Sequence, residues 1–385
     1  MRNVDRIGLS GGVALVYRER VESLRQRMAR HGFDCIFLAP GANLYYFTGL
    51  EMGVSERSSI AIIPASGPSK IVVPELEARK AEALAKVDEV TSYRDEEGPA
   101  SALGFAVEGL KLAGHNVGFE YRSMRVQELE LIRQAMGQLT YGDAGKLFAS
   151  LRATKDEQEL EYMAKACAIV EAGMESALAA IKPGASEFQV QAEIEQDLRR
   201  AGVMGHVQMS VASGERSGSG HNSTSGRTIM EGDLVWVDLM VSVEGYYADI
   251  TRTFPVGRVS HNLQEIYQVV LEAQQATRER AGPGMTGREI DAIARGIIES
   301  RGFGEYFTHR TGHGLGLEIH EEPYIVASNE TPLEPGMTFT IEPGIYLPGE
   351  GGVRIEDDVV LVPNGCKSMT NFRRNLLTQK SKYVV

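Results

Sequence analysis

The strongest constraint on the fold is a weak internal repeat in the second half of the chain. Three landmarks recur with an offset of 100 residues: a Pro-Gly turn, a capping-box helix start and a glycine that ends the helix. They stand at Pro183–Gly184 and Pro283–Gly284, at Ser186 and Thr286, and at Gly202 and Gly302. Such a repeat predicts two copies of one supersecondary unit that bury their apolar faces against each other.

The repeat continues into strands that carry acids. In each copy a glycine turn leads into an apolar strand with one acid, and a second strand carries another. The acids are Asp238 and Asp249 in the first copy and Glu342 and Glu356 in the second. A pseudo-two-fold axis between the copies would bring the four acids to one place. We therefore expect residues 151–385 to form one domain of two helix–helix–hairpin units.

Four converging carboxylates indicate a metal site. An ionised carboxylate in an apolar strand is costly unless it is paired or bound to metal, and neighbouring carboxylates repel one another. Two divalent cations would balance the four negative charges. One imidazole completes the set, and His313 fits because it lies in a glycine-rich run where backbone and ligands can approach closely. The sequence thus predicts a two-metal centre with Asp238, Asp249, His313, Glu342 and Glu356 as ligands.

Composition excludes several other classes of protein. The 385 residues carry a formal charge of -12, which argues against nucleic acid as a partner. Three widely spaced cysteines fit neither a disulfide framework nor a zinc cluster. No apolar run of about 18 residues predicts a membrane span, and the N-terminus has no apolar signal segment. We expect a cytoplasmic protein with no membrane association.

The first 150 residues alternate helical and β-rich patterns, which predicts an α/β domain over residues 1–150. A helix is expected over Arg18–Arg30, with Gly32 as its stop. A capping box at Thr154 and Glu157 predicts the start of a long helix that leads into the second domain. Strands are expected at Cys35–Leu38, Ile60–Ile63, Ile71–Val73 and Val117–Phe119.

Several motifs resemble those of the pita-bread metallopeptidases, which include methionine aminopeptidase, prolidase, aminopeptidase P and metal-free creatinase. The resemblance covers the whole chain and implies a creatinase-type α/β domain followed by an α+β pita-bread domain with an internal pseudo-two-fold repeat. All five metal-ligand positions are filled, as in the metal-bearing branch. The motifs are Asp249-Ile-Thr-Arg-Thr, Gly312-His-Gly-Leu-Gly-Leu-Glu-Ile-His-Glu, Ile341-Glu-Pro-Gly and Arg354-Ile-Glu-Asp.

The resemblance also implies a role for each residue of the site. Asp238 would bind one ion, His313 and Glu342 the other, and the two remaining acids would bridge them. A water between the ions would become a hydroxide nucleophile, and Glu342 would handle its proton as a general base and then acid. Three further catalytic residues are implied, two histidines that steady the scissile carbonyl and an arginine that pairs with site or substrate carboxylates: His221, His320 and Arg354.

Two departures from the family pattern bear on the substrate. Leu239-Met240 follows the first acid where relatives commonly have Phe-Gly, which we interpret as a packing change. The loop Ser213–Asn222 lacks the Asn and Pro that relatives acting on Xaa-Pro usually carry before the histidine. The first hypothesis remains an Xaa-Pro dipeptidase or aminopeptidase acting on short peptides. The alternatives are a hydrolase or lyase acting on a small amide, of the ectoine hydrolase kind, and a non-catalytic binding protein.

The sequence limits the metal and the assembly only broadly. Oxygen-rich ligation with one imidazole suits manganese, cobalt or zinc, and we expect manganese. A homodimer is expected because dimers are usual in the resembled family.

Overall fold

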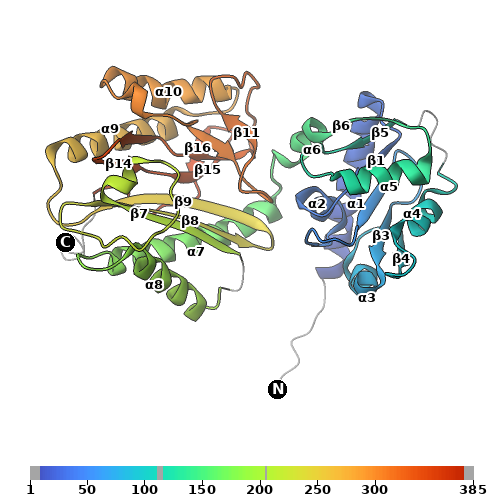
Figure 1. Ribbon diagram of the computed structural model, residues 1–385. Coiled ribbons are helices and arrows are strands. Elements are labelled where there is room, and N and C mark those ends of the chain that lie inside the picture. The colour runs from blue at the N-terminus through green and yellow to red at the C-terminus, as the bar shows by residue number, and fades with distance from the viewer. Residues whose placement is uncertain (1–8, 111–115, 204–205, 377–385) are drawn as a thin grey trace. The chain divides into compact units, whose positions relative to one another are not determined.

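The computed structural model describes residues 9–110, 116–203 and 206–376. The chain divides into two compact units, Met1–Leu151 and Arg152–Val385. Each unit has its own sheets, covering helices and buried core (Figure 1).

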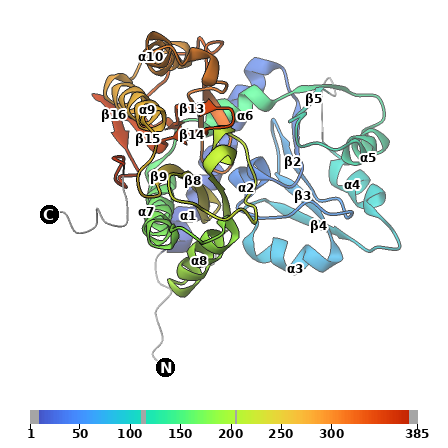
Figure 2. The same ribbon diagram turned by 60° about the vertical axis from the view of Figure 1, so that its left-hand side comes forward.

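The N-terminal unit is built on one mixed sheet of six strands in the order β4-β3-β2-β1-β5-β6. β1 pairs antiparallel with β2 and parallel with β5, so the sheet changes direction at its centre. The apolar side chains of β1–β3 pack against α4 and α5, which cover one face (Figure 2). The strands are β1 (Cys35–Leu38), β2 (Ile60–Pro64), β3 (Lys70–Pro74), β4 (Glu89–Tyr93), β5 (Asn116–Phe119) and β6 (Thr140–Asp143).

The predicted helix and strands of this unit are confirmed to within a few residues at most ends. α1 extends further toward the N-terminus than Arg18, and Gly32 after it has a φ of 73°, the left-handed conformation that ends a helix. The helices are α1 (Leu9–His31), α2 (Ala42–Thr48), α3 (Glu75–Leu84), α4 (Pro99–Val107), α5 (Val126–Met136) and α6 (Gly145–Arg152).

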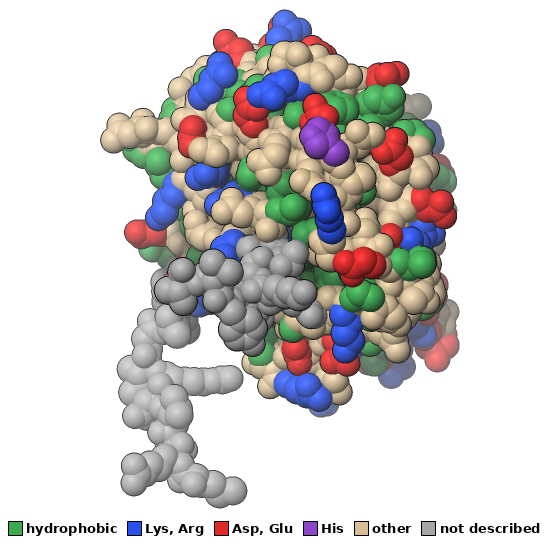
Figure 3. Space-filling model, turned by 90° about the vertical axis from the view of Figure 1, so that its left-hand side faces the viewer, with side chains coloured by type: hydrophobic (Ala, Val, Ile, Leu, Met, Phe, Trp, Pro, Cys, Tyr) green, Lys and Arg blue, Asp and Glu red, His purple; other side chains and the backbone are tan. Residues whose placement is uncertain are grey.

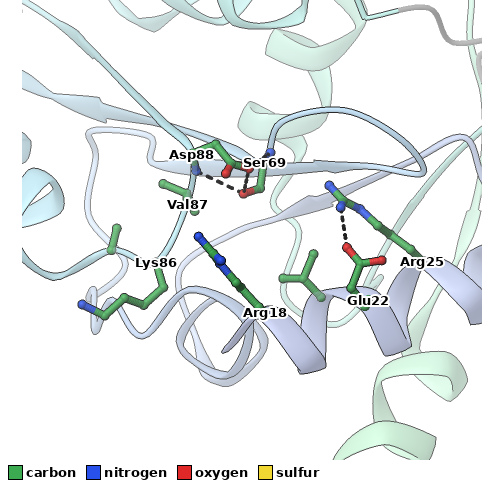
Figure 4. Close-up of a pocket in the computed structure, with 9 residues that line it drawn as sticks. Arg18, Glu22, Arg25, Ser69, Lys86, Val87 and Asp88 are labelled. Atoms are coloured by element: carbon green, nitrogen blue, oxygen red, sulfur yellow. Dashed lines mark hydrogen bonds and ion pairs between the residues drawn. The ribbon is translucent and has the colours of Figure 1, made fainter. Parts of the chain in front are cut away.

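A pocket of about 400 Å³ lies between α1 and the β3–β4 side of this unit (Figure 4). Its charged groups largely satisfy one another. Arg25 pairs with Glu22 at 2.7 Å, and the Ser69 hydroxyl donates to Asp88 at 2.8 Å. Among the described residues that line this pocket, no three potential metal ligands lie close together.

The C-terminal unit has helices on the outside and strands between them (Figures 1 and 2). α7 and α8 pack against the three-stranded sheet β7-β8-β9, and α9 and α10 lie on the opposite side. The helices are α7 (Glu157–Ala180), α8 (Glu187–Arg200), α9 (His261–Arg280) and α10 (Gly287–Ser300). Each copy of the repeat thus starts with two helices, as the sequence predicts.

The strands of the two copies differ in how they are grouped. The first copy forms one antiparallel sheet, β7 (Val207–Ser213), β8 (Leu234–Val243) and β9 (Tyr246–Pro255). The second copy divides into a five-stranded sheet, β11-β10-β12-β15-β16, and the hairpin β13–β14. Its strands are β10 (Gly312–Gly314), β11 (Glu321–Ile325), β12 (Thr338–Ile341), β13 (Gly344–Leu347), β14 (Gly351–Arg354), β15 (Asp357–Val362) and β16 (Gly365–Ser368).

The helix starts follow the predicted capping chemistry with one correction. Ser186 and Thr286 each form a reciprocal capping box with the side chain three residues on. The long helix α7 is capped by Asp156 and Glu159, so the prediction of Thr154 as the cap is wrong. Thr154 instead forms an isolated β-bridge with Met337, and the helix begins two residues later than a Thr154 cap would require.

Backbone and side-chain bonds join the two copies along one line. The Glu356 amide donates to the Thr251 carbonyl at 3.1 Å, and the Arg354 amide donates to the Thr253 hydroxyl at 3.1 Å. Arg252 is buried and reaches across the same line, donating to the Glu356 carbonyl and to the Asp357 carboxylate at 2.7 Å. These bonds fix the acid of one copy against the strand of the other.

Successive side chains of β8 point to opposite faces of the sheet, so the residues that pack in the core alternate with those that face the site pocket. Leu239 is fully buried and packs against α7 at Gly173, where an added Cβ would lie 2.3 Å from the leucine side chain. Asp238 and Met240 face the other way and line the site pocket. Leu239 therefore belongs to the packed core, whereas the side chain of Met240 lines the pocket. The interpretation of this pair as a packing change stays a prediction.

The surface of this unit carries mixed charge. On the face shown in Figure 3, basic and acidic side chains alternate and do not gather into one basic patch. Within the described ranges, no helix is long and apolar enough to cross a bilayer.

Because α7 packs tightly on β8, a glycine-to-alanine substitution in α7 should affect the stability of the protein differently from one in α10. Gly173→Ala should lower the free energy of unfolding by about 1–3 kcal/mol, because the new methyl group overpacks against Leu239. Gly296→Ala in α10, whose Cβ meets nothing within 4 Å, should be neutral or stabilising by up to about 1 kcal/mol. Denaturant unfolding followed by the single tryptophan, Trp236, measures both, and equal stabilities would contradict the tight packing.

Candidate metal centre

Asp238 and Asp249 lie on the same face of the β8–β9 hairpin. Asp238 is the register partner of Thr251, and Asp249 lies two residues before Thr251. The two acids are therefore diagonal neighbours, close enough for their side chains to act together. Both have one buried carboxylate oxygen, Oδ1, that accepts no hydrogen bond from any described residue. A buried oxygen without a donor is costly unless a cation occupies the space before it.

The second copy supplies two glutamates from the ends of its strands. Glu342 is the first residue after β12, and Glu356 lies in the two-residue connection between β14 and β15. The Thr340 hydroxyl donates to Glu342 at 3.1 Å, and the Thr251 hydroxyl donates to Glu356 at 2.6 Å. Each bond restricts one oxygen of its carboxylate and orients the other.

His313 sits in β10 with its ring held in one orientation. Its Nδ1 lies 3.1 Å from the Gly314 carbonyl, so Nδ1 carries the proton and Nε2 presents a lone pair. Nε2 is 3.2 Å from Glu342 Oε1 and 4.0 Å from Asp249 Oδ2. The ligand atoms of Asp249, His313 and Glu356 all lie within 4.8 Å of one another. This tautomer is the one that a metal-binding histidine usually adopts.

Glycines make the close approach around His313 possible. A Cβ on Gly312 would lie 1.8 Å from the Thr340 carbonyl oxygen, and one on Gly314 would lie 2.3 Å from the Glu322 carbonyl oxygen. Both neighbours are backbone atoms that cannot move aside. Close packing therefore requires glycine on either side of the histidine, since any larger residue would clash with the neighbouring backbone.

The pKa shifts of the site reflect burial and mutual repulsion. Burial raises the pKa of Asp249 and Glu356 well above the ordinary range, and neighbouring carboxylates raise them further. Burial also raises the pKa of Glu342 to about 7, although the Arg354 and Arg310 charges oppose the shift. The pKa of His313 is lowered, mainly by burial, so the imidazole is neutral. Acids that resist ionisation together and a neutral imidazole favour a bound cation.

All eight residues predicted for the site line one pocket of about 870 Å³ in the C-terminal unit. Five are the acids and His313 discussed above. His320 packs edge-on against the His313 ring, with ring centroids 4.2 Å apart. His221 is exposed at the pocket wall. Arg354 is buried and donates to Asp238 at 2.6 Å.

Arg354 connects the acids to the loop that carries His221. Besides Asp238, its guanidinium donates to the Gly220 carbonyl at 2.9 Å, to the Thr251 hydroxyl at 3.0 Å and to the Tyr346 hydroxyl at 3.1 Å. It also lies over the Trp236 ring. All its hydrogen bonds therefore go to protein groups around Asp238.

The unusual loop Ser213–Asn222 is a firmly attached wall of the pocket. Buried Glu187 on α8 accepts from the amide and hydroxyl of Ser213, both at 2.8 Å, and from those of Ser225. The loop forms a 3₁₀ turn, η1 (Gly214–Gly218), and a Cβ on Gly218 would lie 2.5 Å from the Leu347 carbonyl oxygen. The glycine and serine content of this loop thus serves close packing on the β13–β14 hairpin.

Sequence reasoning missed two pocket residues just before His313, and a tyrosine whose hydroxyl contacts one of them and also Arg354. His309 and Arg310 precede β10, and Tyr346 lies in β13. His309 Nε2 lies 2.9 Å from the Tyr346 hydroxyl, and burial lowers the pKa of His309 to about 4. No periodicity or motif spacing marks these residues, because only the fold brings them together.

Comparisons with known proteins agree with this architecture. The pattern of metallopeptidase family M24 matches residues 161–363, and that of the creatinase/prolidase N-terminal domain matches residues 20–154. The chain is 37% identical to an Xaa-Pro dipeptidase of Pyrococcus furiosus, over 94% of this chain and 100% of the relative.

Solved structures give the same result. A prolidase from Thermococcus sibiricus has a TM-score of 0.88 and 34% identity, covering 94% of this chain and 99% of that one. An X-Pro aminopeptidase from Thermotoga maritima has a TM-score of 0.82 and 31% identity, covering 93% and 99%. The predicted fold, a creatinase-type domain followed by a pita-bread domain, is confirmed.

The raised pKa values predict how pH affects the metal-free protein. Acids with a raised folded pKa stabilise the fold below their unfolded pKa and lose that contribution as pH rises through the folded pKa. For Glu342 the loss runs from about pH 4.5 to beyond pH 7. With a chelator present, the free energy of unfolding should fall between pH 5 and pH 8, by up to about 1.4 kcal/mol per pH unit for each titrating carboxyl.

The same titration with added Mn²⁺ should remove the decline, because bound cations take the place of the protons. Asp249→Asn should flatten the decline without metal, since one repelling charge is gone. A metal-free protein equally stable at pH 5 and pH 8 would contradict the assigned repulsion.

Proposed function

Because the chain belongs to metallopeptidase family M24, we propose that it is a metal-dependent hydrolase that cleaves the peptide bond before proline, as an Xaa-Pro dipeptidase or aminopeptidase. The observation that carries the proposal is the set of four carboxylates and one neutral imidazole that face one pocket. The relatives with this architecture are named Xaa-Pro dipeptidase, prolidase and X-Pro aminopeptidase.

The residues present fit two divalent cations. Unpaired buried oxygens on Asp238 and Asp249, raised carboxyl pKa values and a free imidazole nitrogen are what a bound cation would satisfy. Asp238 would hold one ion, His313 and Glu342 the other, and Asp249 and Glu356 both. Oxygen-rich ligation with one imidazole suits manganese best among the candidates, with cobalt or zinc as alternatives.

In the proposed mechanism the chain handles the proton and the carbonyl. When bound, the ions acidify water and polarise the scissile carbonyl. Glu342 takes the proton of the attacking water and passes it to the proline nitrogen as the bond breaks. His221 and His320 donate to the carbonyl oxygen as charge develops on it. Arg354 holds Asp238 in place through its 2.6 Å bond.

Two further features belong to the proposal. We propose a homodimer and a cytoplasmic location. A small-molecule hydrolase of the ectoine hydrolase kind is not favoured, since the relatives named above are peptidases. A non-catalytic binding protein is not favoured either, because every acid and histidine expected of the site lines the pocket.

Peptide assays test the activity directly. Purified protein supplied with Mn²⁺ should hydrolyse Leu-Pro or a longer Leu-Pro peptide and leave Leu-Gly largely intact, because the pocket is proposed to accept the tertiary amide before proline. Chelator should abolish the activity, and Mn²⁺ should restore it. Failure to cleave any Xaa-Pro substrate under these conditions would refute the proposal.

Glu342→Ala separates metal binding from turnover. We expect the turnover number to fall by on the order of 10³-fold, since a proton acceptor in the transition state contributes about 10²–10⁴. At least one ion should remain, because Asp238, Asp249 and Glu356 are intact. Elemental analysis and initial rates measure the two effects, with Glu334→Gln, an exposed change elsewhere, as the control. Full activity of Glu342→Ala would rule out the assigned role.

A further inference from the structure

The loop that carries His221 has little stiffness of its own. Three of the seven residues before the histidine are glycines, Gly214, Gly218 and Gly220. Glycine has more conformational freedom to lose on folding than any other residue. His221 is exposed at the pocket wall, so its own side chain is not fixed by burial. Groups outside this segment must therefore hold the histidine in one position.

The carboxylate of Glu187 holds both ends of the loop. Glu187 is the first residue of α8 and is fully buried. Its Oε1 accepts from the amide and the hydroxyl of Ser213, both at 2.8 Å. Its Oε2 accepts from the amide of Ser225 at 2.9 Å and from the Ser225 hydroxyl at 2.6 Å. A carboxylate has about four acceptor sites, so these bonds use its hydrogen-bonding capacity.

Arg216 extends this attachment to the residues next to His221. Its Nε lies 3.4 Å from Oε2 of Glu187, and its guanidinium donates to the Ser223 carbonyl at 2.6 Å. Its own carbonyl accepts from the Asn222 side chain at 2.6 Å. The contacts thus run from Glu187 through Arg216 to the two residues that follow the histidine.

The internal repeat indicates that the helix itself does not need this carboxylate. Thr286 caps α10 by the same reciprocal capping box with which Ser186 caps α8. The next residue is Gly287 in the second copy and Glu187 in the first. The second copy therefore forms the helix with no side chain at this position. Burial of a carboxylate costs free energy, and in the first copy this cost serves to hold the loop.

We infer that Glu187, together with Arg216, is a positioning residue that holds His221 where its imidazole can donate to the scissile carbonyl. The inference rests on the proposed function, in which His221 stabilises the charge that develops on the carbonyl oxygen. Glu187 is not among the described residues that line the pocket, so it acts on the reaction through the loop. A displaced donor loses most of its effect, because stabilisation of the transition state depends on preorganised geometry.

A double-mutant cycle separates positioning from a general loss of structure. Glu187→Gln keeps the size of the side chain, but its amide nitrogen cannot accept a hydrogen bond. In the metal-loaded enzyme, this change should lower kcat for Leu-Pro by about 10- to 100-fold and alter KM by less than about 3-fold. In the His221→Ala background it should lower kcat by less than about 3-fold, because the group that Glu187 positions is already absent.

Three further variants complete the set. Arg216→Met should give a smaller fall in kcat that also depends on His221, and its cycle decides the question if Glu187→Gln does not fold. Glu193→Gln makes the same chemical change at an exposed site of α8 and should leave kcat unchanged. Thr286→Ala removes a helix cap in the second copy, so it should lower the midpoint of denaturant unfolding and leave kcat unchanged.

Hydrogen exchange tests the attachment of the loop without any turnover. In Glu187→Gln, the amide of Ser213 or of Ser225 should exchange at least about 10-fold faster, according to which of them faces the amide nitrogen. The amides of α9, which lie away from the loop, should keep their native rates.

The outcomes separate the two proposals. An equal loss of kcat in the native and His221→Ala backgrounds, or unchanged exchange at both serine amides, overturns the positioning role and leaves the Xaa-Pro activity standing. No cleavage of Leu-Pro or of a longer Leu-Pro peptide by the native enzyme refutes the proposed function, and the role of Glu187 falls with it.

Discussion

Mutual repulsion among buried carboxylates is the constraint on which the C-terminal unit depends. Asp249, Glu342 and Glu356 have raised pKa values because burial disfavours their charge and each adds to the field of the others. A chain that gathers such groups must hold them together by other interactions. Two kinds of interaction do this. Hydrogen bonds join the two copies, from Arg252 and between the backbones of Glu356 and Thr251, and helices pack on both sides of the sheets.

The repeat solves a geometric problem as well. One strand hairpin can bring two acids together, as β8 and β9 do with Asp238 and Asp249. A second copy that faces the first doubles the number of acids at the site, and neither hairpin has to be longer. The copies have diverged in their strands, since the second divides into a sheet and a separate hairpin. This hairpin, β13–β14, packs against the loop that carries His221 and so helps to hold that wall of the pocket in place.

Much of the fold and of the candidate site could be predicted from the sequence. The offset of 100 residues and the acids in apolar strands predicted the repeated unit, because helix caps, glycine stops and strand periodicity are local signals. Thr154 was wrongly assigned as a cap because two overlapping patterns, at Thr154 and Asp156, both satisfy the capping-box rule. His309 and Arg310 could not be found, since their position in the pocket depends on long-range packing that no local pattern records, and the same packing places Tyr346 against His309.

The bonds of Arg354 have a consequence for how such an enzyme can change its substrate. The same guanidinium holds the Gly220 carbonyl in the loop and the carboxylate of Asp238. Loop and acid centre are therefore not independent modules. A loop transplanted from a relative would shift Gly220, the guanidinium would follow, and Asp238 would lose its partner. New specificity in this scaffold is thus more accessible through wall residues such as Met240, whose thioether side chain has no hydrogen-bond donor to offer the acids, than through exchange of the whole loop.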